Sequence, residues 1–205
     1  MAKCRDRATC REVSLTSLCA IIVSACSANR AVPPASPAMP CYGCILSRFG
    51  DKTGASGDCC RRQLHRGIDV GATDGADVVA VADGIVVGAA YSKLSGGEIT
   101  LYHERYGLWT RYVHVKNMSI FDGKRVSRGD VIGQVGLFPN SDGVPHVHLE
   151  VCNDKLCEPN PRVTGVLDPL PFVVKCNGML PSDDVAKPVL LMPVRCSYAR
   201  STEFF

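Results

Sequence analysis

Histidines and one aspartate occupy separate stretches of the chain in patterns that suit metal chemistry. His65 and Asp69 are four residues apart, and a glycine between them lets the chain turn both groups to one side. His146 and His148 alternate within an apolar segment, and side chains two residues apart on a strand point to the same side. One imidazole of such a pair can bind a metal while its neighbour contacts whatever the metal binds.

His114 ends a further apolar stretch and could bring a fourth imidazole to the same face. The set therefore offers two imidazoles and a carboxylate, with histidines to spare. Such a trio leaves a tetrahedral Zn²⁺ with one open coordination position, which is typical of catalytic zinc sites. A spare histidine can move a proton and stabilise developing negative charge. The fifth histidine, His103, is interpreted as structural.

The elements that must position these residues are predicted to be short strands joined by tight turns. No stretch of residues 60–160 has sustained helical periodicity, so the fold class is predicted to be mainly β. Asp83-Gly84 is a favoured two-residue turn signal and predicts a hairpin between strands at Val78–Ala82 and Ile85–Ala89. Further strands are expected at Glu98–His103, Leu108–Val115, Val131–Val135 and His146–Cys152.

Composition indicates one ordinary domain with appendages. The chain has 205 residues, of which 46% are hydrophobic and 21% charged, so it can bury a core. Of the formal net charge of +3, residues 1–25 carry +2, which leaves about +1 on the rest of the chain. A nearly neutral body argues against a nucleic-acid partner.

The N-terminus is predicted to be an export signal. Residues 1–12 are basic and residues 13–25 are mostly apolar, so we expect a signal peptide over 1–25. Val23–Cys26 resembles the lipobox of bacterial lipoproteins, which predicts lipidation of Cys26. Ordinary cleavage after Ala28 stays open. Residues 26–40 are proline-rich and predict a stiff tether. The protein is therefore expected in the periplasm or cell envelope, held to a membrane by a lipid anchor.

Export to an oxidising space predicts that the eight cysteines that follow Cys26 in the sequence form disulfides. Cys152 and Cys157 flank a short turn and could join across it, and Cys176–Cys196 could pin the C-terminal region. The alternative is a second metal site, whose ligands would be Cys41, Cys44, Cys59 and Cys60.

Leu46–Pro161 resembles a lysostaphin-like (LytM-type) zinc endopeptidase domain in the order and spacing of its motifs. The matching segments are Ser47–Gly50, His65–Val70, Val79–Val86, Tyr106-Gly107 with Thr110–His114, Val126–Gly133 and Pro145–Glu150. The resemblance implies a compact antiparallel β-sheet or sandwich-like domain of the duplicated hybrid motif type over residues 41–162. Residues 163–205 are then an irregular, cysteine-containing C-terminal extension.

The resemblance also implies one Zn²⁺ per domain, with His65, Asp69 and His148 as ligands and His114 and His146 as the catalytic pair. The implied activity is hydrolysis of the peptide cross-links of bacterial peptidoglycan, with its peptide stems as substrate. The alternative is a non-catalytic LytM-type module that binds wall or activates another envelope hydrolase. A secreted protease that acts on proteins also stays open.

Overall fold

A computed structural model of the protein describes residues 42–52, 64–154, 157, 165–174, 176 and 188–196. All of them belong to one compact unit, Met39–Phe205. The predicted signal peptide 1–25, the tether 26–40 and Cys26 lie outside the described residues, and so do Cys41, Cys59 and Cys60. No helix within the described ranges is long and apolar enough to cross a membrane.

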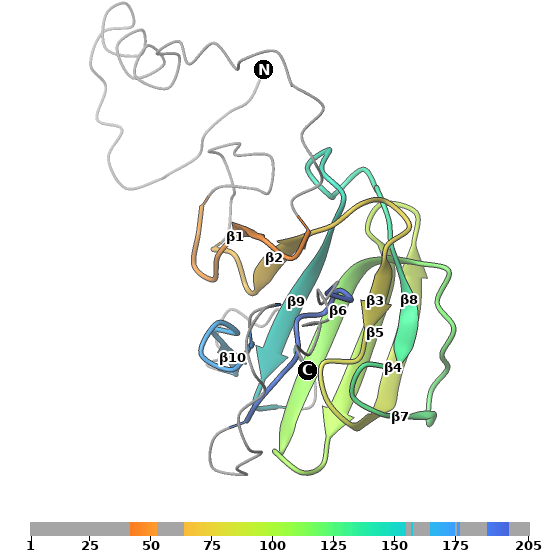
Figure 1. The fold of residues 1–205 in the computed structure, drawn as a ribbon, viewed down its shortest axis with the longest axis vertical. Helices are drawn as coiled ribbons and strands as arrows, with labels where there is room; N and C mark the ends of the chain where they lie inside the picture. Colours follow the sequence, from red (N-terminus) through yellow and green to blue (C-terminus); the bar gives the residue numbers. More distant parts are fainter. Residues whose placement is uncertain are drawn as a thin grey trace, which may run out of the picture. The chain divides into compact units, whose positions relative to one another are not determined.

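The described residues form ten strands and no helix, which confirms the mainly β prediction. Every strand pairing is antiparallel, and the main sheet has the order β1-β2-β9-β6-β5-β4-β7 (Figure 1). β10 pairs with β9, and β8 pairs with both β3 and β6. The strands are β1 Ile45–Ser47, β2 Ile68–Gly71, β3 Asp77–Val79, β4 Gly84–Ser92, β5 Gly96–His103, β6 Leu108–Lys116, β7 Arg125–Val126, β8 Val131–Val135, β9 His146–Cys152 and β10 Val166–Leu167.

β9 divides its side chains between the hydrophobic core and the opposite face of the sheet. Val147, Leu149 and Val151 are fully buried in the core cluster. His146, His148 and Glu150 alternate with them and therefore project to the other side. This period of two is the pattern that the H-x-H segment predicts, and it places the polar residues together over an apolar base.

The predicted hairpin between Val78–Ala82 and Ile85–Ala89 is wrong. The start of β4, where this hairpin would pair, has β5 on one side and β7 on the other, and β3 pairs with β8 instead. The backbone after β3 is bound elsewhere. Ala80 exchanges two hydrogen bonds with the 129–130 turn, and the carbonyl of Val81 accepts one from Leu191. The turn signal at Asp83-Gly84 leads into a strand with different partners.

The described part of the C-terminal extension packs into the same core as the predicted domain. Leu190, Met192 and Val194 are buried in the core cluster, and Val194 forms an antiparallel bridge with Val78 of β3. The disulfides Cys152–Cys157 and Cys176–Cys196 are both present, as predicted. None of the described residues beyond 163 lines the cavity over β9 and β6 that is described next.

Candidate metal centre and catalytic cleft

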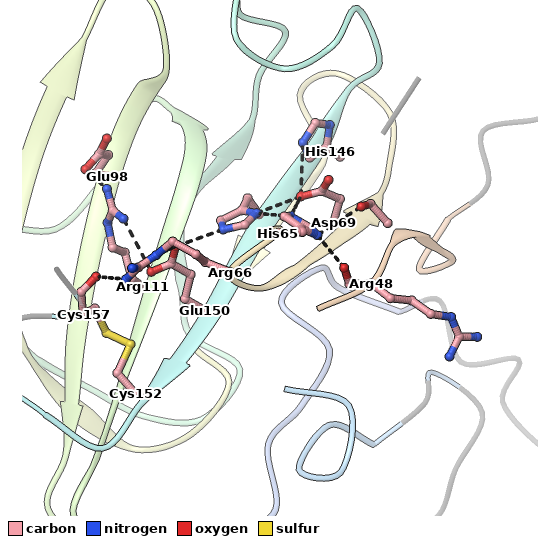
Figure 2. Close-up of polar contacts among 12 residues, drawn as sticks. Arg48, His65, Arg66, Asp69, Glu98, Arg111, His146, Glu150, Cys152 and Cys157 are labelled. Carbon is pink, nitrogen blue, oxygen red and sulfur yellow. Dashed lines mark hydrogen bonds and ion pairs between the residues drawn. A yellow bond between two sulfur atoms is a disulfide. The ribbon is translucent and has the colours of Figure 1, made fainter. Parts of the chain in front are cut away.

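Three side chains from distant parts of the chain converge on one point beside β9. The Nε2 atom of His65 lies 3.0 Å from Oδ1 of Asp69 and 2.8 Å from Nδ1 of His148. The His148 Nδ1 atom is in turn 2.8 Å from the same carboxylate oxygen. These are the three residues that the resemblance implies as metal ligands, and the structure brings them together. Figure 2 shows the contact between His65 and Asp69.

Strand register explains how Asp69 and His148 meet. In the β2–β9 pair, Asp69 lies directly opposite His148, and opposite residues of an antiparallel pair have their Cβ atoms about 5 Å apart. Gly67 lets the chain enter β2 from His65 at close range. A Cβ atom at position 67 would collide with the carbonyl of Leu149 and approach the His148 ring, so this glycine has no room for a side chain.

His65 is fixed by the turn that follows β1. Its backbone N–H donates to the carbonyl of Asp51, and its carbonyl accepts from Gly50. Its Nδ1 atom lies 2.9 Å from the carbonyl of Arg48 and 3.0 Å from the hydroxyl of Ser47. Because a carbonyl can only accept, Nδ1 carries the ring proton, and Nε2 presents a lone pair to Asp69 and His148.

His146 and His114 are oriented in the same way. Nδ1 of His146 donates to the carbonyl of Val144 at 2.7 Å, and Nδ1 of His114 donates to the carbonyl of Ser95 at 2.9 Å. Each ring therefore keeps Nε2 for other partners, and the Nε2 atom of His146 lies 3.6 Å from Oδ1 of Asp69. The two rings are in edge-to-face contact with their centroids 4.8 Å apart.

A β-bulge brings His114 to this face. Strict alternation along β6 would place His114 on the core side with Tyr112, because Arg111 and Val113 face the cleft. Two residues, Val113 and His114, lie opposite Glu98 of β5, and His114 has a φ of 67°. The extra residue shifts the alternation and re-aims the imidazole, as bulges beside active sites commonly do.

The converging groups open into a cavity of about 300 Å³. Four carboxylates and one guanidinium line it together with three of the histidines, so its own side chains favour a cation. The lining residues are Asp69, Ser95, Glu98, Arg111, Val113, His114, Asn140, Asp142, His146, His148 and Glu150.

The pKa values of the four ionisable groups around the centre are shifted in different directions. Burial lowers the pKa of His114 to about 4, helped by the neighbouring His146, and burial also lowers the pKa of His146. Burial alone would lower the pKa of His148, but the carboxylates of Asp69 and Glu150 overcome it and raise that pKa to about 9. Burial alone would raise the pKa of Asp69, yet the imidazoles of His148 and His65 beside its carboxylate hold that pKa well below its usual range.

The donor set fits a metal ion. Nε2 of His65 and Oδ1 of Asp69 are both acceptors, they lie 3.0 Å apart, and both side chains are almost fully buried. Two buried acceptors face each other favourably only when a proton or a cation lies between them. Imidazole and carboxylate are ligand types that Zn²⁺ prefers, and three such ligands are the number found in catalytic zinc sites.

Two residues beside His148, Glu150 and Arg66, were not predicted from the sequence to be part of the site. Glu150 contacts Nε2 of His148 at 3.3 Å, and Arg66 contacts Glu150 at 3.3 Å. A signal for Glu150 was available, because positions 146, 148 and 150 share one face of β9. Arg66 had no such signal, since its partner is 84 positions away in sequence.

Residues 63–159 match the model of peptidase family M23. The chain contains a peptidase family M23 domain. Its fold matches the catalytic domain of the antimicrobial peptidase lysostaphin from Staphylococcus simulans, with a TM-score of 0.51 and 23% identity. That match covers 63% of this chain and 91% of the lysostaphin domain.

Curated relatives of the M23 domain include two wall enzymes. The peptidoglycan DD-endopeptidase ShyC of Vibrio cholerae is 32% identical over 88 residues, which are 43% of this chain and 20% of ShyC. The DD-carboxypeptidase/endopeptidase Mpg of Neisseria meningitidis is 38% identical over 88 residues, with the same coverage of 43% and 20%. This chain thus spans about a fifth of the length of these relatives.

Proposed function

We propose that this protein is a zinc-dependent endopeptidase that hydrolyses the peptide cross-links of bacterial peptidoglycan. The observation that carries the proposal is the convergence of His65, Asp69 and His148 at the cavity that His114 and His146 line. The M23 domain supports a peptidase. The two relatives named as endopeptidases, one of them a peptidoglycan DD-endopeptidase, support wall peptide stems as the substrate. We further propose that the protein is exported and anchored to a membrane through a lipid on Cys26.

In this proposal His65, Asp69 and His148 hold the ion through Nε2, Oδ1 and Nδ1. A bound Zn²⁺ would supply a Lewis acid that polarises the scissile carbonyl and acidifies water. The nearly complete burial of His65 and Asp69 excludes bulk solvent from the ligand side and strengthens every charge interaction there.

His114 and His146 supply the proton transfers. Their lowered pKa values keep both rings neutral near pH 7, so the Nε2 atom of either ring can accept a proton from the attacking water. Their Nδ1–H groups stay on the carbonyls of Ser95 and Val144, which fixes the orientation of both rings. The protonated ring can then stabilise the oxyanion and return the proton to the leaving amine.

The test compares the wild-type protein with the His148→Ala variant on purified sacculi. Mass spectrometry of the digest should show loss of cross-linked dimers and new free amines at the cleaved links for the wild type only. An equal cleavage rate for both proteins would overturn the metal assignment. Bound zinc in the wild type without any cleavage would favour the binding module, and cleavage of casein but not of sacculi would favour a protease that acts on proteins.

A further inference from the structure

A buried carboxylate supports His148 on the side away from Asp69. Glu150 lies two residues after His148 on the same face of β9, and its side chain is 3% exposed. Its Oε1 atom is 3.3 Å from Nε2 of His148. The ring of His148 therefore lies between two carboxylates, with Asp69 at Nδ1 and Glu150 at Nε2.

Two guanidinium groups hold Glu150 in this position. The Nε atom of Arg66 lies 3.3 Å from Oε1 of Glu150, and Nη1 of Arg111 lies 3.5 Å from Oε2 (Figure 2). Arg111 also makes a 2.6 Å ion pair with Glu98. The network is electrically balanced, because it contains two guanidiniums and two carboxylates, and a buried carboxylate with such partners is stable as an anion.

Arg66 is itself anchored at the far end of β9. Its Nη2 atom donates to the carbonyl of Cys157 at 2.6 Å. Cys157 is joined by a disulfide to Cys152, the last residue of β9. The contacts thus connect the disulfide through Arg66 and Glu150 to the imidazole of His148. Figure 2 shows Cys152, Cys157, Arg66 and Glu150 of this series.

The orientation of His148 depends on this support. An anionic carboxylate only accepts hydrogen bonds, so the contact with Glu150 places a proton on Nε2 of His148 and leaves Nδ1 as the atom for a metal. A carboxylate on the far nitrogen also makes the metal-binding nitrogen more basic and fixes the plane of the ring.

We propose that Glu150 is a positioning residue that sets the metal affinity of His148, and that Arg66 holds Glu150 in place for this task. The inference rests on the proposed function, because it takes His148 as a ligand. The competing interpretation is that the ion pairs of Glu150 with Arg66 and Arg111 only stabilise the packing of β9. Loss of these ion pairs would then lower the stability of the metal-free protein and leave the metal affinity unchanged.

The test measures zinc affinity in the full chain by competition with a chromophoric chelator. The Glu150→Gln variant keeps the size of the side chain but removes its charge, and we expect its zinc affinity to fall about 10- to 100-fold. The visible spectrum of the cobalt-substituted variant should shift as well, because the ligand field at His148 changes. Arg66→Met should weaken zinc binding less, since Glu150 keeps its charge and its contact with Arg111 but loses one of the two guanidiniums that hold it. It also serves as the second variant if Glu150→Gln fails to fold.

The matched control is Glu104→Gln, which removes the charge of an exposed glutamate that lies 3.3 Å from Arg125. Its zinc affinity should equal that of the wild type. Unchanged zinc affinity and an unchanged cobalt spectrum in both Glu150→Gln and Arg66→Met would overturn the inference. Weakened zinc binding in these variants together with a wild type that binds zinc but cleaves no sacculi would overturn the proposed function alone. A wild type that binds no zinc would overturn both.

Discussion

His103 and the histidines of the cleft are buried alike but bonded differently. His103 is 0% exposed, and the cleft residues His65, His146 and His114 are 3%, 1% and 7% exposed, so burial does not separate the two regions. Both ring nitrogens of His103 are hydrogen-bonded to neutral groups of the protein, with Nδ1 2.8 Å from the carbonyl of Asp83 and Nε2 2.8 Å from the hydroxyl of Thr110.

In the cleft, three rings use Nδ1 on a backbone carbonyl and keep Nε2 for the site. His148 is reversed, with Nε2 on Glu150 and Nδ1 toward Asp69. We conclude that a buried histidine is a candidate for chemistry when one ring nitrogen is held by the protein and the other is directed to the converging groups of the site. A histidine with two neutral partners is a part of the core.

The strongest test of this comparison is the His114→Ala variant. We expect its cleavage rate on sacculi to fall about 10²- to 10⁴-fold, because it loses a group that moves protons. Its zinc content should stay at the wild-type level, since His114 is not one of the three converging ligands. Zinc content is measured by atomic absorption on the purified protein, and a parallel loss of zinc would place His114 among the ligands instead.

His103→Ala should give the opposite result. Removing a fully buried ring leaves a cavity and strips partners from the Asp83 carbonyl and the Thr110 hydroxyl, so the free energy of unfolding should fall by about 2–4 kcal/mol. Denaturant unfolding of the metal-free protein measures this loss. The cleavage rate per folded molecule should not change, and a drop in that rate would connect His103 to the chemistry.

Metal removal should act only on the cleft. With free zinc at 100 times its dissociation constant, chelation should cost about 2.7 kcal/mol of stability, which is roughly 5–10 °C in unfolding temperature for a chain of this size. Calorimetry with and without a chelator measures the shift, and added zinc should reverse it. His148→Ala should show almost no shift, whereas His103→Ala should keep the full one.

The pH dependence should separate metal-free from zinc-loaded protein. The pKa of His148 is raised in the folded state to about 9, so its stabilising contribution is complete below about pH 6.5 and is lost as the pH rises toward 9. The decline should be at most about 1.4 kcal/mol per pH unit in the metal-free protein. Zinc at Nδ1 takes the place of the proton, so the loaded protein should lack this decline. An equal decline in both forms, measured by denaturant unfolding, would argue against zinc at His148.

Much of the site could be predicted because strands impose a period of two. The alternation of His146 and His148 with Val147 and Leu149 places both imidazoles on one face, and β9 has this arrangement. The order and spacing of the motifs likewise predicted that His65 and His148 lie in the same metal site, although they are 83 positions apart in the sequence.

Other features depend on contacts that no local pattern records. The hairpin predicted at Asp83-Gly84 is absent because β7 occupies the edge of β4. A bulge opposite Glu98 turns His114 into the cleft, where a regular strand would have turned it into the core. The support of Glu150 by Arg66 requires two side chains from separate segments to meet, and spacing in the sequence gives no sign of it.

The chemical types of the site residues follow from the amino-acid sequence alone, and so does the shared face of His146 and His148 on β9, because side-chain identity and strand periodicity are local properties. Which atoms meet depends on the folded protein: on the register that places Asp69 opposite His148, on the bulge at His114, and on the backbone carbonyls that fix the proton on Nδ1 of the His65, His114 and His146 rings. Strand register and hydrogen-bond partners depend on the packing of the whole sheet, because each strand has only two edges and its neighbours are set by all the other pairings.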